Sequence, residues 1–122
     1  MTKKDNYSLY KNPQLWGGPA WTLLHCITFT YPNKPSSSDI KNYENFFLSL
    51  QDVLPCPSCR QHYSEYIQKH PIKNHLLSRT KLINYFIKLR NYIDKNYKNK
   101  KPLTIQQSKN LINFNIQNKL YK

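Results

Sequence analysis

The chain has 122 residues, two glycines and a formal net charge of +13, with 19 Lys and Arg against 6 Asp and Glu. This length suits one domain with a single core and excludes two independent cores. No apolar run reaches the roughly 18 residues that span a membrane. The charged start from Met1 to Asp5 leads into no apolar signal segment, so we expect a soluble chain made in the cytosol, without a membrane partner.

The excess of positive charge has two interpretations. It is typical of proteins that bind nucleic acid through phosphate contacts. It is also typical of AT-rich genomes, whose codon bias enriches Lys, Asn, Ile and Tyr together, as in this chain. Because the lysines are dispersed, we favour the second interpretation and predict no nucleic-acid partner. A positive field still favours an anionic ligand such as a dinucleotide.

The predicted elements are all helices. Residues 1–11 form a polar tail that we expect to be mobile. Asn12-Pro13 is a start signal for the first helix, with Asn as the cap and Pro in the first turn. The later helices are expected over about residues 38–54, 56–69 and 78–97 and from about Thr104 onward, with loops at 32–38 and 98–101.

Apolar residues at helical spacing give each predicted helix a side that faces a common core. In the first helix, Trp21, Leu24, His25 and Thr28 share one side, and plain core packing is the simpler interpretation of His25 from periodicity alone. Amphipathic helices joined by short loops predict an all-α bundle. The expected core stripes of the later helices are Ile40, Tyr43, Phe46, Phe47, Leu50 and Leu54, then Leu82, Ile83, Phe86, Leu89, Ile93 and Tyr97, then Ile105, Leu111, Ile112 and Ile116.

Two glycines follow Trp16 near the start of the first helix. Gly17 and Gly18 remove side chains at a point where a planar ligand or another backbone could approach closely.

A Cys-x-x-Cys pair separates the second predicted helix from the third. Pro55 ends the incoming helix, and Pro57 suits the first position of the next, which places Cys56 at the N-cap and Cys59 at the third helical position. A thiolate there faces unpaired backbone N–H groups and the positive end of the helix dipole. We therefore expect a thiol pKa below the ordinary value of about 8.5.

Three interpretations of this pair remain open from spacing alone: a redox dithiol, half of a zinc site, or an inert structural bridge. His70 and His75 complete a C-x2-C-x10-H-x4-H order that is close to a small zinc finger. Pro71 lies between the two histidines, where a finger needs an unbroken helix. The segment before Cys56 also predicts a helix instead of a hairpin. We therefore predict no metal site.

Several further motifs stand in order around the cysteine pair. They are Trp16-Gly17-x-Pro19-x-Trp21-x-x-Leu24-His25, Tyr31-Pro32, Phe46-Phe47 and Leu54-Pro55-Cys56-x-x-Cys59-x-x-His62-Tyr63. Together they resemble the Erv/ALR family of FAD-linked sulfhydryl oxidases, and most of all its short forms from large DNA viruses. The resemblance runs from about Trp16 to Pro102. It implies a sulfhydryl oxidase domain over residues 12–102, followed by a fifth helix over 103–122.

The resemblance implies a four-helix bundle with a short fifth helix and FAD at the mouth of the bundle. By position, the residues implied to bind FAD are Gly17, Trp21, His25, Cys59, Tyr63, Arg90, Asn91, Asp94 and Lys101. Trp21 would use its flat face and His25 a ring nitrogen. Cys59 would lie beside the isoalloxazine, and Cys56 would be the more accessible sulfur that exchanges with substrate.

The implied reaction is disulfide formation in client dithiols. A client thiolate attacks Cys56, a second client thiol resolves the mixed disulfide, and Cys59 passes two electrons through flavin to oxygen, which leaves as hydrogen peroxide. The chain has neither the N-terminal shuttle cysteine pair nor the second disulfide of many cellular relatives. Electrons would therefore come directly from the client or from a separate viral thiol carrier. We expect virion proteins as clients, action in the host cytoplasm or virus factory and in the virion, and a homodimer.

One motif departs from the family pattern. Where the family has His-Asn-x-Val-Asn, this chain has Arg90-Asn91-Tyr92-Ile93-Asp94. Arginine can stack on a base and donate to phosphate, and Arg90 lies one turn from Asp94, with which it could pair. The alternatives are that Arg90 is an exposed charge without a ligand role, and that the whole bundle is a flavin-free scaffold. Lys101-Pro102 matches a family Lys-Pro only if the preceding loop gains two residues.

Cys26 is the odd cysteine of the chain. We favour a buried core position for it, and the alternative is a disulfide between two subunits.

Overall fold

The computed structural model describes residues 6–121, and within that range it contains helices and no strand. A short 3-10 helix, η1 (Asn6–Lys11), precedes the first α-helix, and a second one, η2 (Ile72–His75), lies between the third and fourth. Neither was expected from the sequence. The α-helices are α1 (Pro13–Phe29), α2 (Ser37–Val53), α3 (Pro57–Lys69), α4 (Arg79–Tyr97) and α5 (Ile105–Leu120).

The helices begin where capping residues stop the preceding loop. Asn12 Oδ1 accepts a hydrogen bond from the Gln14 backbone N–H at 2.9 Å, as predicted for the start of α1. Ser36 and Asp39 form a reciprocal capping box at α2, and Thr104 and Gln107 form one at α5. The structure therefore confirms the predicted helices to within two residues at their starts.

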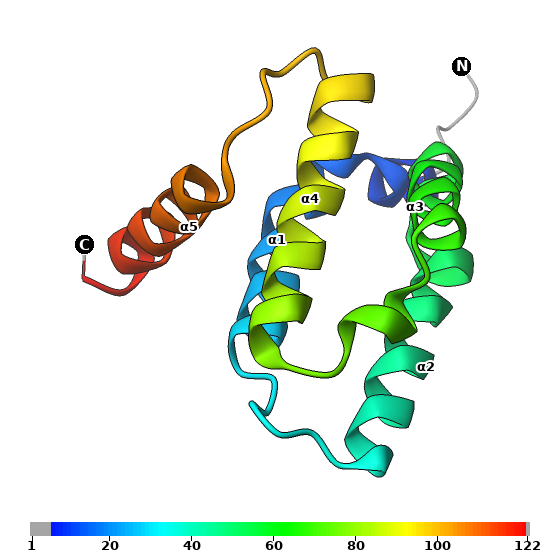
Figure 1. Ribbon diagram of the computed structural model, residues 1–122. Coiled ribbons are helices and arrows are strands. Elements are labelled where there is room, and N and C mark those ends of the chain that lie inside the picture. Colours follow the sequence, from blue (N-terminus) through cyan, green and yellow to red (C-terminus); the bar gives the residue numbers. More distant parts are fainter. Residues whose placement is uncertain (1–5, 122) are drawn as a thin grey trace, which may run out of the picture.

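Helices α1 to α4 form the bundle, in which α1 packs on α4, and α3 packs on both α2 and α4 (Figure 1). The loop after α4 carries α5 back against α1 and α4, on the side away from α2. The core between the four main helices contains the fully buried side chains Tyr31, Phe47, Leu76, Leu82, Phe86 and Leu89. An all-α bundle with an added fifth helix is the predicted fold class.

Two motif tyrosines hold the bundle together through buried hydrogen bonds. Tyr31 OH donates to the Leu76 carbonyl at 2.7 Å, which ties the loop after α1 to the segment before α4. Tyr63 OH donates to the Phe47 carbonyl at 2.6 Å, which ties α3 to α2. A buried hydroxyl without such a partner would be costly, so these bonds fix how the helices meet.

Several side chains assigned to the core are exposed. Phe46 is 41% exposed, Tyr97 42% and Leu111 46%, so the neighbouring helices cover these side chains only in part. Cys26 is also exposed, which contradicts the favoured core position. Helix α4 covers the other side of α1, where Leu24, His25 and Thr28 are buried as predicted.

The predicted mobile tail spans the edge of the described range. Its residues 6–11 form η1, while residues 1–5 lie outside the described residues. No helix in the described part is long and apolar enough to cross a membrane.

Candidate active site

The cysteine pair lies at the N-terminus of α3, as predicted. Cys56 is the N-cap, and its Sγ accepts a hydrogen bond from the Cys59 backbone N–H at 3.2 Å. The Ser58 hydroxyl lies 3.2 Å from the same sulfur. Both cysteines are free thiols in this structure. The first turn of the helix therefore directs hydrogen-bond donors at one sulfur of the pair.

The two thiols differ in acidity. Burial acts to raise the pKa of Cys56, but hydrogen bonds from the Cys59 and Ser58 side chains and backbones outweigh it, and the net effect lowers the pKa. Burial raises the pKa of Cys59 to about 11, together with its hydrogen bond to Cys56 and the charge of that residue. The lowered thiol pKa expected from the helix N-terminus is therefore confirmed for Cys56 and wrong for Cys59.

The expected order of accessibility is also wrong. Cys56 is buried, with 8% of its surface exposed, whereas Cys59 is partly exposed.

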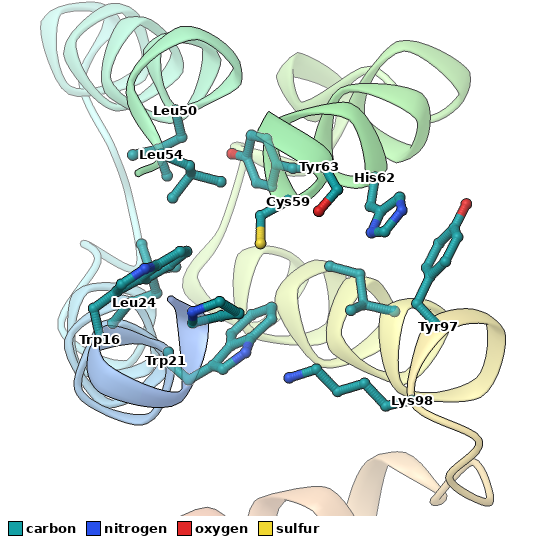
Figure 2. A pocket seen from close by; sticks show the side chains of 15 residues that line it. Trp16, Trp21, Leu24, Leu50, Leu54, Cys59, His62, Tyr63, Tyr97 and Lys98 are labelled. Atoms are coloured by element: carbon teal, nitrogen blue, oxygen red, sulfur yellow. The ribbon is translucent and has the colours of Figure 1, made fainter. Parts of the chain in front are cut away.

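Cys59 opens into an apolar cavity of about 230 Å³, here called the thiol cavity. Its sulfur points into the space bordered by Trp16, Trp21 and Leu54 (Figure 2). Four of the residues implied to bind a cofactor line this cavity, namely Gly17, Trp21, Cys59 and Tyr63. Such a lining suits a flat, mostly apolar ring system.

The structure has room for a side chain at both glycines of α1. A Cβ on Gly17 would meet only the Pro13 Cβ, at 3.9 Å, and one on Gly18 would meet nothing within 4 Å. Close approach of another described backbone is therefore excluded as their reason. Gly17 lines the thiol cavity, so a side chain there would enter space that a ligand could occupy.

Arg90 joins three of the predicted residues. Its guanidinium lies 5.3 Å from the centre of the Trp21 ring, its Nη1 lies 3.1 Å from His25 Nε2, and its Nε lies 4.0 Å from Asp94 Oδ2. The ion pair between Arg90 and Asp94 confirms the predicted pairing. The alternative in which Arg90 is simply an exposed surface charge is wrong.

The contact with Arg90 determines the tautomer of His25. An arginine side chain has only donors, so Arg90 Nη1 donates to Nε2, and the proton of the neutral imidazole lies on Nδ1. Burial lowers the pKa of His25 to about 4, with a further contribution from the charge of Arg90. His25 is 2% exposed, and its Nδ1 is buried without a hydrogen-bond partner. A buried donor of this kind fits a ligand that brings an acceptor.

A second cavity, of about 260 Å³, lies on the other side of Arg90 and is here called the arginine cavity. Residues from α4, the loop after it and α5 line it, and the predicted His25, Arg90, Asn91, Asp94 and Lys101 are among them. Lys100, which sequence reasoning did not select, adds a third cation. Asn91 is already engaged, since its amide donates to the Leu103 carbonyl at 2.9 Å and so holds the loop before α5.

Sequence reasoning also missed residues at the mouth of the thiol cavity. Tyr97 stacks on His62 with ring centres 3.4 Å apart, and Lys98 reaches toward Trp21 from the end of α4 (Figure 2). The charge of Lys98 acts to lower the pKa of Cys59. His62 belongs to the Cys-x-x-Cys-x-x-His-Tyr motif and could have been found from it. Nothing in the sequence marked Lys98.

The zinc interpretation does not fit this arrangement. Cys56 caps the start of α3 and His70 caps its end, so all 13 residues of the helix separate them. In the described part of the chain, no group of three or more His, Cys, Asp or Glu side chains could hold a metal ion.

The difference between the two thiols predicts a two-step titration of the reduced protein. In a Cys26→Ser background, we expect a first thiolate below the ordinary cysteine pKa of about 8.5 and a second near 11. Thiolate absorbance at 240 nm, corrected for tyrosine ionisation, measures both steps. Cys56→Ser should remove the first step, and Cys59→Ser in the same background is the matched control. Loss of the first step in the Cys59 variant alone would contradict the assignment.

Comparison with known proteins finds relatives of this chain in sequence and in fold. The Erv1 / Alr family matches residues 19–117. A probable FAD-linked sulfhydryl oxidase of Acanthamoeba polyphaga mimivirus is 35% identical over 98 residues, which cover 80% of this chain and 68% of that protein. A protein of Invertebrate iridescent virus 3 named for the same activity is 31% identical over 68% of this chain, and the match spans 56% of its own length. The yeast Erv1 core superimposes with a TM-score of 0.74 at 21% identity, covering 88% of this chain and 86% of that one, and shows the same fold.

Proposed function

Since this chain belongs to the Erv1 / Alr family, we propose that it is an FAD-dependent thiol oxidase that forms disulfide bonds in client proteins. The observation that carries the proposal is the position of Cys59. It is one half of a dithiol and also lines an apolar, aromatic cavity that suits a flat redox ring. Relatives from large DNA viruses bear the name of this activity.

The residues present fit FAD. The thiol cavity offers Trp21 and Cys59 to the apolar ring, and the arginine cavity offers Arg90, Lys100 and Lys101 to the negative diphosphate. His25 also lines the arginine cavity, and its Nδ1–H is a donor without a partner. When bound, FAD would accept two electrons from the dithiol and pass them to oxygen, giving hydrogen peroxide.

The chain's own residues would act on the client by thiol–disulfide exchange. Cys56 is the sulfur of the pair that does not line the thiol cavity, so it is assigned to the client although it must first become exposed. A client thiolate attacks Cys56 Sγ of the oxidised pair, the Cys56–Cys59 bond breaks, and Cys59 leaves with the electron pair. A second client thiol then attacks the mixed disulfide, which releases the client disulfide and leaves the reduced pair. Burial and the neighbouring Cys56 raise the pKa of Cys59 to about 11 in the reduced pair, which works against its departure as a thiolate, and Ser58 and the charge of Lys98 offset part of that rise. The net reaction is 2 R–SH + O₂ → R–S–S–R + H₂O₂.

The alternative function is a flavin-free scaffold. The reason for it is that Arg90 and Asp94 replace the His and Asn of the family motif and could prevent FAD binding. The structure removes its main reason, because each residue has a partner and neither buries an isolated charge. Both side chains line the arginine cavity.

An absorption spectrum tests the cofactor directly. We expect purified protein to bind FAD at one per chain, with an oxidised-flavin band in the visible region. Arg90→Ala should weaken FAD binding by about tenfold or more, since it removes a cation from the dinucleotide site and the support of His25. Arg60→Ala is the matched control, because Arg60 lines neither cavity. A colourless protein that takes up no added FAD would favour the scaffold.

We also propose that the protein forms a homodimer. We further propose that its clients are virion proteins and that it acts in the host cytoplasm or in the virion. The dimer would use α1, where Leu15, Leu23 and Cys26 are exposed. Sedimentation with and without reductant tests both the dimer and the remaining alternative for Cys26, a disulfide between subunits.

A further inference from the structure

A third cavity lies away from the cysteine pair and takes no part in the proposed reaction. It has a volume of about 380 Å³, and its lining includes His70, His75, Lys81, Asn84, Tyr85 and Lys88. We call it the histidine cavity. It lies at the C-terminal end of α3, between η2 and the first half of α4, whereas Cys59 lies at the opposite end of α3. The two sites are therefore separated by the length of that helix.

The histidine cavity has cationic and neutral side chains and no acidic ones. Lys81 and Lys88 are exposed at its edge, and neither takes part in an ion pair or side-chain hydrogen bond in the described part of the chain. The stretch that forms it, residues 66–88, contains five Lys or Arg and neither Asp nor Glu. Positive charge without a local partner attracts an anion.

The two imidazoles are held in place by packed tyrosines. The His70 ring lies 4.5 Å from Tyr66, and the His75 ring lies 4.9 Å from Tyr85, centre to centre. Tyr85 OH donates to the His70 carbonyl at 2.6 Å. Burial lowers the pKa of His75, and the charges of Lys88, His70 and Lys81 lower it further, so three basic groups act on this imidazole. Groups fixed in advance lose little entropy when a ligand binds.

One buried acceptor lacks a partner in this lining. Asn84 Oδ1 is inaccessible to solvent and accepts no hydrogen bond in the structure. A ligand that combines negative charge with a hydrogen-bond donor would therefore suit the cavity. A protonated phosphate has both, and the second pKa of a phosphate monoester, near 6, keeps the proton available just below neutral pH. Sulfate has the charge and lacks the donor.

We propose that the histidine cavity is a binding site for a phosphate group, either inorganic phosphate or the phosphate monoester of a small molecule. Lys81 and Lys88 would neutralise its charge, His70 and His75 would donate to its oxygens, and Asn84 would accept from its hydroxyl. This site does not depend on the proposed oxidase activity or on either of the other two cavities.

Calorimetric titration with inorganic phosphate and with AMP tests the site, at pH 6.5 in about 150 mM salt with saturating FAD, and sulfate is titrated as a comparison. We expect one phosphate group bound per chain. The double variant Lys81→Gln/Lys88→Gln should bind it about tenfold more weakly or worse, since two charge-assisted contacts are lost. Lys11→Gln/Lys109→Gln, which removes the same charge from η1 and α5, should stay within about twofold.

The two ligands distinguish the source of the phosphate. Equal affinity for both indicates free phosphate, and tighter binding of AMP indicates a monoester; either result supports the site. Equal weakening in the two double variants would show a general charge effect and overturn the proposal. So would the absence of binding, competition with FAD, or a sulfate affinity equal to that of phosphate.

Discussion

Cys59→Ser is expected to abolish thiol oxidation while FAD remains bound. Serine keeps the shape of the side chain that lines the thiol cavity, but its hydroxyl forms no disulfide and transfers no electron pair. We expect oxygen consumption with dithiothreitol to fall by about a thousandfold or more, as when a group that forms a covalent intermediate is removed. An oxygen electrode measures the rate, and the visible flavin band of the same sample measures occupancy.

Cys26→Ser is the matched control for this experiment. It makes the same chemical change on α1, at an exposed cysteine that lines none of the three cavities described here. We expect its rate to stay within about twofold of the wild type, in line with a surface substitution. Retained oxygen consumption in the Cys59 variant, with flavin bound, would contradict the proposed reaction. Loss of flavin in that variant would show that Cys59 also supports the cofactor.

His25 is expected to make the folded protein sensitive to mild acid. Its pKa falls from 6.5 to about 4 in the folded chain, so between these values the unfolded chain binds more protons than the folded one. Stability is therefore fully present above about pH 6.5 and is lost as the pH falls toward 4. At about 1.36 kcal/mol per pH unit, the loss attributable to His25 reaches about 3 kcal/mol.

Urea unfolding at pH 7 and pH 4.5, without FAD, measures this effect. The wild type should lose about 2 to 3 kcal/mol more than His25→Gln between the two pH values, because glutamine has no proton to gain. His62→Gln is the control, since His62 is only partly buried and stacks on Tyr97 at the cavity mouth. It should retain the acid sensitivity of the wild type. Equal pH dependence in the wild type and His25→Gln would show that other groups cause it.

At position 90, arginine stands where the family pattern has histidine, and the neighbouring side chains accommodate it. Arginine is longer than the histidine of the family pattern, and here it reaches Trp21 and His25 on α1 while keeping Asp94 on its own helix. The residue therefore lies between the thiol cavity and the arginine cavity. Each of the two cavities presents a different part of the Trp21, His25 and Arg90 cluster.

Local sequence determined the helices and the position of the cysteine pair. Asn12, Ser78 and Thr104 each begin a helix because a short polar side chain bonds to the N–H groups of the turn that follows it. Pro55 and Pro57 placed Cys56 at an N-cap by the same local rule. The family motifs added the cofactor and the reaction, because they fix residue types at spacings that helical periodicity leaves free.

Only the tertiary structure decided what covers each helix and where side chains from different helices meet. Cys26 and Tyr97 were predicted to be buried and are exposed. The prediction failed because helical periodicity identifies the apolar side of a helix and does not say which neighbour covers it. The contact of Arg90 with His25 joins residues 65 positions apart, and the histidine cavity joins α3, η2 and α4. Such meetings depend on how the helices pack, which no single stretch of sequence contains.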